Sequence, residues 1–199
     1  MAICLVCTGG IGSGKSYAVK IFNKLGVPAY IADDRAKELY KSDKILLDRL
    51  VKLLGEDIVC DGQLRKEIMA AKIFPNPALL AKVNEIVHPR VLEDFNLWKV
   101  RKEKEGFKVV IFESAIYFEI PLFHSIAYKV IVVTASYDVR ISRVMKRDNL
   151  SEQSVKERMA RQCSDEEREK RADFIIFANG KRAILPQILH ILETVNYFS

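Results

Sequence analysis

Near its start the chain reads Gly9-Gly10-Ile11-Gly12-Ser13-Gly14-Lys15-Ser16, which satisfies the pattern G-x-x-x-x-G-K-S/T. An apolar run precedes it at residues 2–8, as expected for a buried parallel strand. After it, apolar residues recur at helical spacing from Ala18 to Leu25, and Gly26 predicts the end of that helix. A strand, a glycine-rich loop and a helix in this order are typical of a phosphate-binding loop, so a chance glycine turn is disfavoured.

The residue types of this loop suit a nucleoside triphosphate. Glycines let successive backbone N–H groups turn toward phosphate oxygens, because no Cβ blocks the required angles. The N-terminus of the following helix adds partial positive charge. We expect Lys15 to reach the terminal phosphates and the Ser16 hydroxyl to ligate Mg²⁺, which is the predicted cofactor.

Composition narrows the class of protein. A chain of 199 residues suits one main domain with a small insertion. The net charge of +6 would suit nucleic acid or a small polyanion, but the basic residues are mixed with acids and no nucleic-acid motif is recognised. A phosphorylated metabolite is therefore favoured. With no signal peptide and no membrane-length apolar run, we expect a cytoplasmic protein that needs no nucleic acid, membrane or obligate protein partner.

Two of the four cysteines, Cys4 and Cys7, form a C-x-x-C on the first predicted strand. Residues three apart on a strand face opposite sides of the sheet. A zinc or redox site is therefore disfavoured, and we predict small buried core residues instead.

Four further apolar segments are predicted as strands, at residues 27–31, 107–113, 129–134 and 172–180 with its exit turn. With the first strand they predict an α/β protein of the P-loop NTPase type, a three-layer α/β/α fold with a five-stranded parallel sheet. Ligands of such sheets lie at the carboxyl ends of the strands.

Polar residues follow three of these strands. Asp33 is placed to accept a proton from an acceptor hydroxyl, although it or Asp34 could instead cap the next helix. Glu113 ends the third strand, where a carboxylate of the Mg²⁺ shell is expected, although Asp is more usual there. Asn179 lies where many P-loop kinases hold adenine.

The segment from Asp43 to Arg101 reads as almost wholly helical, with no strand signal between Ile31 and Lys108. Within it a helix is expected to open at Leu64-Arg65, and a long helix to cover residues 78–104 with a kink or break at His88-Pro89. A helical insertion at this point of a P-loop fold commonly covers the acceptor. Candidate contacts are Arg65, His88 and Arg90, each of which could equally be a solvated helix residue.

A second helical segment is rich in arginine. Arg140, Arg143 and Arg147 recur at helical spacing, and Ser151 and Ser164 are predicted N-caps of two further helices. Arginines above a phosphate-binding loop indicate a lid that closes on the phosphates. The alternative is a surface helix pair held by ion pairs.

Taken together, these motifs resemble the dephospho-CoA kinase family nearly end to end. The resemblance rests on residues 8–16, 25–28, 32–33, 62–65, 88–89 and 118–119, on Phe74, and on the late residues Arg143, Arg147-Asp148, Arg158, Gln162, 172–176 and 179–180. It implies transfer of the ATP γ-phosphate to the ribose 3′-hydroxyl of dephospho-CoA. It also implies a nucleotide core at 1–32, 107–139 and 172–199, a CoA-binding domain at 33–106 and a lid at 140–171.

The resemblance also implies roles for particular residues. Lys15, Asp33 and Arg143 would be catalytic, and Arg65 and His88 would border the acceptor together with Asp33. Ser16 and Glu113 would hold the metal. The residues expected to bind ATP are Gly10, Ile11, Gly12, Ser13, Gly14, Lys15, Ser16, Tyr17, Arg147 and Asn179.

The chain departs from the family pattern at a few positions. Ile31 replaces the first Asp of an Asp-Ala-Asp motif, Tyr17 stands where Thr is common and Arg140 where Gln is common, and residues 115–119 differ from the usual Pro-Leu-Leu-Phe-Glu. None of these changes removes a group that the chemistry requires. Another small-metabolite kinase and a non-enzymatic nucleotide-binding regulator remain the competing interpretations.

Overall fold

A computed structural model describes residues 1–198, and the chain divides into two compact units. The core unit comprises residues 1–31 together with the chain from Lys99 onward. The inserted unit comprises residues 32–98. The insertion therefore enters directly after the second strand.

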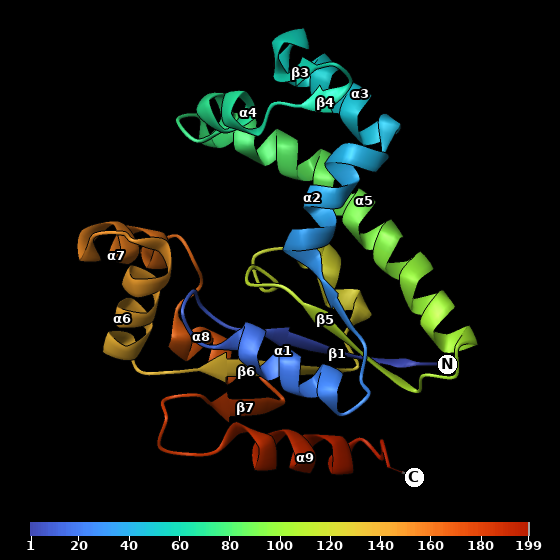
Figure 1. Cartoon of the computed structure of the whole chain (residues 1–199), viewed down its shortest axis with the longest axis vertical. Helices are drawn as coiled ribbons and strands as arrows, with labels where there is room; N and C mark the ends of the chain where they lie inside the picture. Colours follow the sequence, from blue (N-terminus) through green and yellow to red (C-terminus); the bar gives the residue numbers. More distant parts are fainter. Residues whose placement is uncertain (199) are drawn as a thin grey trace. The chain divides into compact units, whose positions relative to one another are not determined.

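The core unit is built on one parallel sheet of five strands, as predicted (Figure 1). The strands lie in the order β2-β5-β1-β6-β7. The strands are β1 (Ile3–Thr8), β2 (Ala29–Ile31), β5 (Val109–Glu113), β6 (Lys129–Thr134) and β7 (Phe174–Phe177). All five residues of β5 are buried, as expected of a strand covered on both faces. Cys7 of β1 and Ile31 of β2 both pair with Glu113 of β5. The carboxyl ends of these three strands therefore lie at one edge of the sheet.

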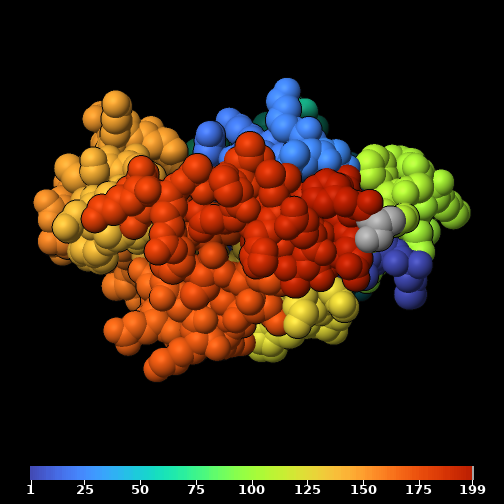
Figure 2. All heavy atoms as spheres, turned by 90° about the horizontal axis from the view of Figure 1, so that it is seen from below, coloured from blue at the N-terminus to red at the C-terminus, as the bar shows by residue number. Residues whose placement is uncertain are grey.

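The helices of the core unit are α1 (Lys15–Lys24), η2 (Pro121–Ile126), α6 (Tyr137–Asp148), α7 (Glu152–Ala160), α8 (Asp165–Lys170) and α9 (Ile184–Thr194). Helices α1 and α9 cover one sheet face, where Phe22, Ile188 and Leu192 pack against Leu5 and Ile131. Figure 2 shows the red C-terminal segment spread over this side of the unit, beside the orange segment of α7 and α8.

Helical spacing in the last segment of the sequence predicts that Ile184, Leu185, Ile188, Leu189 and Leu192 pack on the sheet, and this prediction is partly wrong. Ile188 and Leu192 are buried as expected, but Leu185 is 45% exposed and Ile191, which was not predicted, is buried. The predicted N-caps hold, because the Ser151 side chain accepts from the Ser154 N–H and the Ser164 side chain accepts from the Glu167 N–H.

Both strand cysteines are buried as predicted. Cys7 belongs to the core cluster beneath α1 and α9. Burial raises the pKa of Cys4 to about 12, so its thiol stays protonated at neutral pH. Among residues 1–198, no group of three or more His, Cys, Asp or Glu side chains could hold a metal ion.

The inserted unit contains α2 (Ala32–Ser42), α3 (Lys44–Leu54), η1 (Glu56–Ile58), β3 (Val59–Cys60), β4 (Gln63–Leu64), α4 (Lys66–Ile73) and most of α5 (Pro77–Lys104). The helix α5 runs through Pro89 rather than breaking there. None of the described helices is long and apolar enough to cross a membrane.

The expectation that this segment holds no strand is wrong, because β3 and β4 form a small antiparallel hairpin. Asp61 and Gly62 connect them with φ angles of 51° and 74°. An Asp-Gly pair favours a two-residue turn with positive φ at both positions. Leu64 consequently ends a strand, and the next helix begins at Lys66 instead.

Candidate active site

The phosphate-binding loop, residues 9–16, joins β1 to α1 in the core unit. Gly14 has a φ of 104°, a left-handed conformation that lets α1 begin directly at Lys15. The helix has no side-chain cap and no acidic residue in its first turn. Its N-terminal N–H groups therefore keep the partial positive charge that attracts an anion.

The Lys15 side chain lies over this loop. It is 8% exposed, and its Nζ donates to the carbonyl oxygens of Gly9 at 2.8 Å and Gly10 at 3.3 Å. The hydroxyl oxygens of Thr8 and Ser13 are also buried, and neither has a hydrogen-bond partner in the part of the chain that the structure describes. Unsatisfied buried hydroxyls are rare in native proteins and are consistent with a ligand-binding loop.

Glu113 lies at the carboxyl end of β5 and is 7% exposed. Burial raises the pKa of the Cys7 thiol, the Glu113 charge raises it further and the Lys15 charge opposes both. The two charged groups are thus close enough to act on the same buried thiol. Ser16, at the start of α1, is exposed.

These oxygen donors fit a magnesium ion. Mg²⁺ prefers hard oxygen ligands and is usually held by one or two protein groups together with substrate phosphates. The Ser16 hydroxyl and the Glu113 carboxylate are of that kind, and no larger ligand cluster competes within the described residues.

Arg143 of α6 connects the loop to the segment after β7. Its Nη2 donates to the Ala178 carbonyl oxygen at 2.6 Å, and its Nη1 lies 3.4 Å from the carbonyl oxygens of Gly12 and Ser13. A pocket of about 500 Å³ opens here, and its walls come from Gly14, Tyr17, Arg143, Ala178, Gly180, Arg182, Ala183 and Ile184. Its size and mixed lining suit a nucleotide base with its sugar.

Asn179 lies in the segment that forms this pocket but does not line it. Its Oδ1 accepts a hydrogen bond from the Lys181 N–H at 3.3 Å, so the side chain shapes the turn. Sequence reasoning missed Arg182 and Ile184 as lining residues. Their position just after the Asn179-Gly180 turn was the one available signal.

The other two arginines of α6 differ from Arg143. Arg140 is 2% exposed, donates through Nε to the Ile11 carbonyl oxygen at 2.9 Å and pairs with Asp165. Burial lowers the pKa of Arg140, and the Asp165 charge opposes this. Arg147 is exposed and pairs with Asp148 at 2.6 Å, which is the surface ion pair that the alternative interpretation expected.

Asp33 lies in the first turn of α2, in the inserted unit. It lies two positions after Ile31, which is the residue of β2 that pairs with Glu113. Asp33 is exposed, and its neighbour Asp34 pairs with Lys37 at 2.8 Å. Because α2 begins at Ala32, both residues lie inside the helix and neither is its N-cap, which differs from the capping alternative. As acidic groups of the first turn they still interact favourably with the helix dipole.

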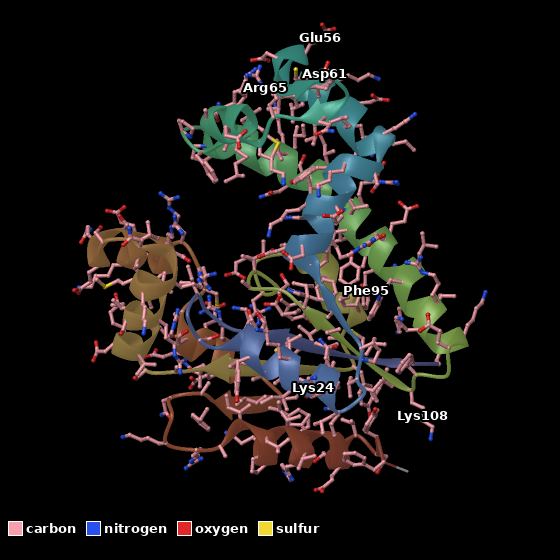
Figure 3. The ribbon with its side chains drawn as sticks, in the orientation of Figure 1. Lys24, Glu56, Asp61, Arg65, Phe95 and Lys108 are labelled. Carbon is pink, nitrogen blue, oxygen red and sulfur yellow. The ribbon has the colours of Figure 1, made fainter. Side chains whose placement is uncertain are left out.

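Three basic residues of the inserted unit were candidate acceptor contacts. Arg65 is exposed beside the hairpin, near Asp61 and Glu56 (Figure 3). His88 is half-buried on α5, and burial lowers its pKa, so the ring is neutral at pH 7. Arg90 instead supports the fold, since it donates to Asp43 at 2.6 Å and to Glu93 at 2.5 Å.

The chain has extensive similarity to known proteins. The matching family model is described as dephospho-CoA kinase and covers residues 3–183. A dephospho-CoA kinase of Bacteroides fragilis strain YCH46 is 36% identical over 192 residues, which are 96% of this chain and 92% of the relative. One of Porphyromonas gingivalis is 37% identical over 194 residues, with 97% and 94% covered.

Two solved structures are also similar to this chain over nearly its whole length. The structure of TT1252 from Thermus thermophilus has a TM-score of 0.82 and 27% identity, and the match covers 98% of this chain and 97% of that one. A dephospho-CoA kinase of Campylobacter jejuni has a TM-score of 0.62 and 25% identity, with 96% of each chain covered.

Proposed function

The chain belongs to the dephospho-CoA kinase family, and on this basis we propose how its residues carry out the family's reaction. The protein is an ATP-dependent kinase that phosphorylates dephospho-CoA in the synthesis of coenzyme A. The acceptor atom is the ribose 3′-hydroxyl, and the products are coenzyme A and ADP. The observation that carries the proposal is the loop of residues 9–16, with Lys15 lying over it, in a chain matched by the family model from residue 3 to residue 183.

The donor ATP binds in the core unit. Its phosphates lie along the loop N–H groups and the start of α1, and Lys15 leaves the carbonyl oxygens of Gly9 and Gly10 to contact the terminal phosphates. The base occupies the pocket between Tyr17 and the Ala178–Ile184 segment. Arg143, already held between this segment and the loop, stabilises negative charge on the transferred group.

Ser16 and Glu113 would hold Mg²⁺ together with the phosphates. When bound, the ion offsets phosphate charge and helps to orient the γ-phosphate. The residues of the chain still have to align donor and acceptor, because phosphoryl transfer depends mainly on positioning and electrostatic stabilisation.

Asp33 accepts the hydrogen bond of the acceptor hydroxyl, orients it toward the γ-phosphate and takes its proton as the new P–O bond forms. Two observations support this role: the exposed carboxylate in the first turn of α2, and its place two residues after the strand that pairs with Glu113. The remainder of dephospho-CoA is received by the inserted unit, where Arg65 offers a cation and His88 a neutral ring.

We also propose a three-part organisation, with residues 1–32, 107–139 and 172–199 as the nucleotide core, 33–106 as the acceptor domain and 140–171 as the lid. Arg147, which is exposed on α6, would exchange Asp148 for a nucleotide phosphate when the lid closes. The cytoplasmic location and the absence of an obligate protein partner stay predictions.

The test is a coupled ADP-release assay with ATP, Mg²⁺ and one acceptor at a time. We expect turnover with dephospho-CoA and none above the background ATP hydrolysis with nucleoside monophosphates, shikimate or gluconate. Phosphorus NMR of the product should place the new phosphate on the 3′-oxygen. Turnover with another acceptor and not with dephospho-CoA would contradict the proposal.

A further inference from the structure

We propose that Gln162 is a positioning residue of the phosphate-binding loop, acting with Arg140 through the backbone of Ile11. The loop is shaped from outside by two side chains that follow it by more than a hundred positions in sequence. The inference rests on the proposed function for its meaning, but it can be tested by nucleotide binding alone.

Both backbone polar groups of Ile11 are bound by side chains. The Ile11 N–H donates to the Gln162 Oε1 at 2.8 Å, and the Ile11 carbonyl oxygen accepts from the Arg140 Nε at 2.9 Å. These bonds fix the orientation of two successive peptide planes in the middle of the glycine-rich stretch. Glycine backbones have wide conformational freedom, so bonds of this kind restrict the loop where its own sequence does not.

The Ile11 side chain adds a third attachment. It packs against a small cluster formed by Ile141 and Val144 of α6 with Val155 and Met159 of α7. This residue of the loop is thus part of the hydrophobic packing of the helices that follow β6. Displacing Ile11 would expose apolar surface as well as break two hydrogen bonds.

The partners of Ile11 are themselves held in place. Arg140 pairs with one oxygen of Asp165, and the other oxygen accepts from Arg168 at 2.9 Å. Arg168 is 1% exposed and lies 3.7 Å from Glu119, whose Oε1 accepts from the Cys163 N–H at 2.8 Å. Because Cys163 directly follows Gln162, the same network fixes the backbone that carries the amide.

Gly10 shows how closely this network approaches the loop. A Cβ at this position would overlap the Arg140 Nη2 and lie 3.0 Å from the Arg168 Nη1. The loop and the two guanidinium groups therefore fit together only without a side chain at residue 10. This contact explains a glycine whose φ is not positive.

The consequence for function concerns ATP and not the acceptor. The peptides of Ile11 set the direction in which the chain enters Gly12–Ser16, whose N–H groups are expected to bind phosphate. Releasing Ile11 should let the empty loop sample other shapes, and nucleotide binding must then select the competent one. Nucleotide affinity should fall, whereas the Michaelis constant for dephospho-CoA should not change.

Two substitutions of similar shape separate the hydrogen bond from packing. Gln162→Met keeps the length of the side chain and removes the acceptor, while Gln162→Glu keeps an acceptor oxygen. Gln153→Met is the matched control, because Gln153 is exposed on α7 and bonds to Glu157 of the same helix. Calorimetry measures the Kd of Mg·ADP for each protein, and kinetics give KM for both substrates.

We expect Gln162→Met to weaken Mg·ADP binding about 5- to 10-fold and to raise KM for ATP by a similar factor, a loss within the range typical of one hydrogen bond. Gln162→Glu should remain within about 3-fold of the parent protein, since its carboxylate still accepts from the Ile11 N–H and lines the same pocket as Arg140 and Arg168, whose charges offset that of Asp165. Gln153→Met should not differ from it. Equal affinities for the Met and Glu variants, or a parallel rise in KM for dephospho-CoA, would overturn the proposal.

Amide hydrogen exchange tests the unmodified protein as well, so that an unstable variant cannot obscure the answer. Without nucleotide, the Ile11 amide should exchange slowly in the parent protein. An unprotected Ile11 amide would refute the proposal without any variant. A parent protein that binds Mg·ADP but does not phosphorylate dephospho-CoA would refute the proposed function and leave the role of Gln162 intact.

Discussion

Arg143 donates to the carbonyl oxygen of Ala178 at 2.6 Å, and this bond connects the α6 helix to the segment that forms one wall of the nucleotide pocket. The other terminal nitrogen of the same guanidinium, Nη1, lies 3.4 Å from the carbonyl oxygens of Gly12 and Ser13. One cation therefore stands between the phosphate-binding loop and the proposed base site.

Replacing Arg143 by lysine should remove the forked geometry while keeping the charge. An ammonium group cannot bond to the Ala178 segment and face the loop at the same time. We expect Arg143→Lys to lower kcat/KM for ATP about 10- to 100-fold in the ADP-release assay. Lys146→Met, an exposed change on the same helix, is the control and should have little effect. Full activity of Arg143→Lys would show that the fork is dispensable.

Lys15→Ala should reduce turnover by at least about 100-fold, because the terminal phosphates lose their main charged contact. The melting temperature should change little by comparison, since the lysine donates to the carbonyl oxygens of Gly9 and Gly10, which lie in the loop itself. Steady-state kinetics and thermal melting of the same preparation make the distinction. A loss of activity that tracks a loss of folded protein would contradict the assignment.

Asp33→Asn should reduce turnover about 100-fold with little change in the Kd of Mg·ADP, since the amide cannot take the acceptor proton. Asp34→Asn is a closely matched control, because both residues are exposed in the first turn of α2. If Asp33 acts only on the helix dipole, the two variants will behave alike. Near-normal turnover of Asp33→Asn would remove its catalytic role.

Gly10→Ala should lower both stability and nucleotide affinity, because its methyl group meets the buried guanidinium groups of Arg140 and Arg168. We expect a loss of about 1–3 kcal/mol in the free energy of unfolding of the core unit. The comparison is Gly62→Ala in the hairpin, where no atom of residues 1–198 lies within 4 Å of an added Cβ and the positive φ is the unfavourable feature. Denaturant unfolding gives both values, and a smaller loss at Gly10 than at Gly62 would argue against the close fit.

Asp43 should make the stability of the inserted unit depend on acid. Burial acts to raise the pKa of this carboxyl, but the hydrogen bonds from Arg90 and from the Leu46 N–H outweigh it, and the net pKa is lowered. A lowered folded-state pKa gives stability that is present above the ordinary carboxyl range, near pH 4, and lost as the pH falls through the folded-state value.

We therefore expect Asp43→Asn to cost about 1–2 kcal/mol at pH 7, where the parent carboxylate caps α3 and pairs with Arg90. The difference between the two proteins should shrink as the pH falls below the ordinary carboxyl range, near pH 4, because the parent residue then takes up a proton and also becomes neutral. Urea unfolding of both proteins at pH 7 and over a series of acidic pH values measures this. A difference that does not vary with pH would mean that the charge of Asp43 contributes nothing.

The sheet was predictable because each of its strands is a continuous apolar run bounded by turn residues. The β3–β4 hairpin was missed because strands of two residues are too short to show any periodicity, and only Asp61-Gly62 signalled it. Leu185 was misjudged for a different reason. Helical spacing predicts which residues share a face, but it does not tell whether the sheet extends as far as the first turn of α9.

The local part of the site was likewise predictable, since residues 9–16 are contiguous and their chemistry follows from their order. The environment of the loop was not. Gln162 and Arg140 lie far from Ile11 in sequence. Glutamine and arginine occur on solvated lid helices as well as in hydrogen-bond networks, so their residue types did not reveal their contacts with the loop. Nor could the sequence show that Arg90, a candidate acceptor contact, pairs with Asp43, which precedes it by 47 positions.

The strand order has a consequence for how the protein is made. Both neighbours of β1 in the sheet, β5 and β6, begin at or after Val109. A ribosome therefore completes the whole of residues 32–98 before the first strand has any partner to pair with. During that interval β1 has no paired strand, and the loop that follows it is not yet anchored to a sheet. The ATP site can therefore form only late in translation.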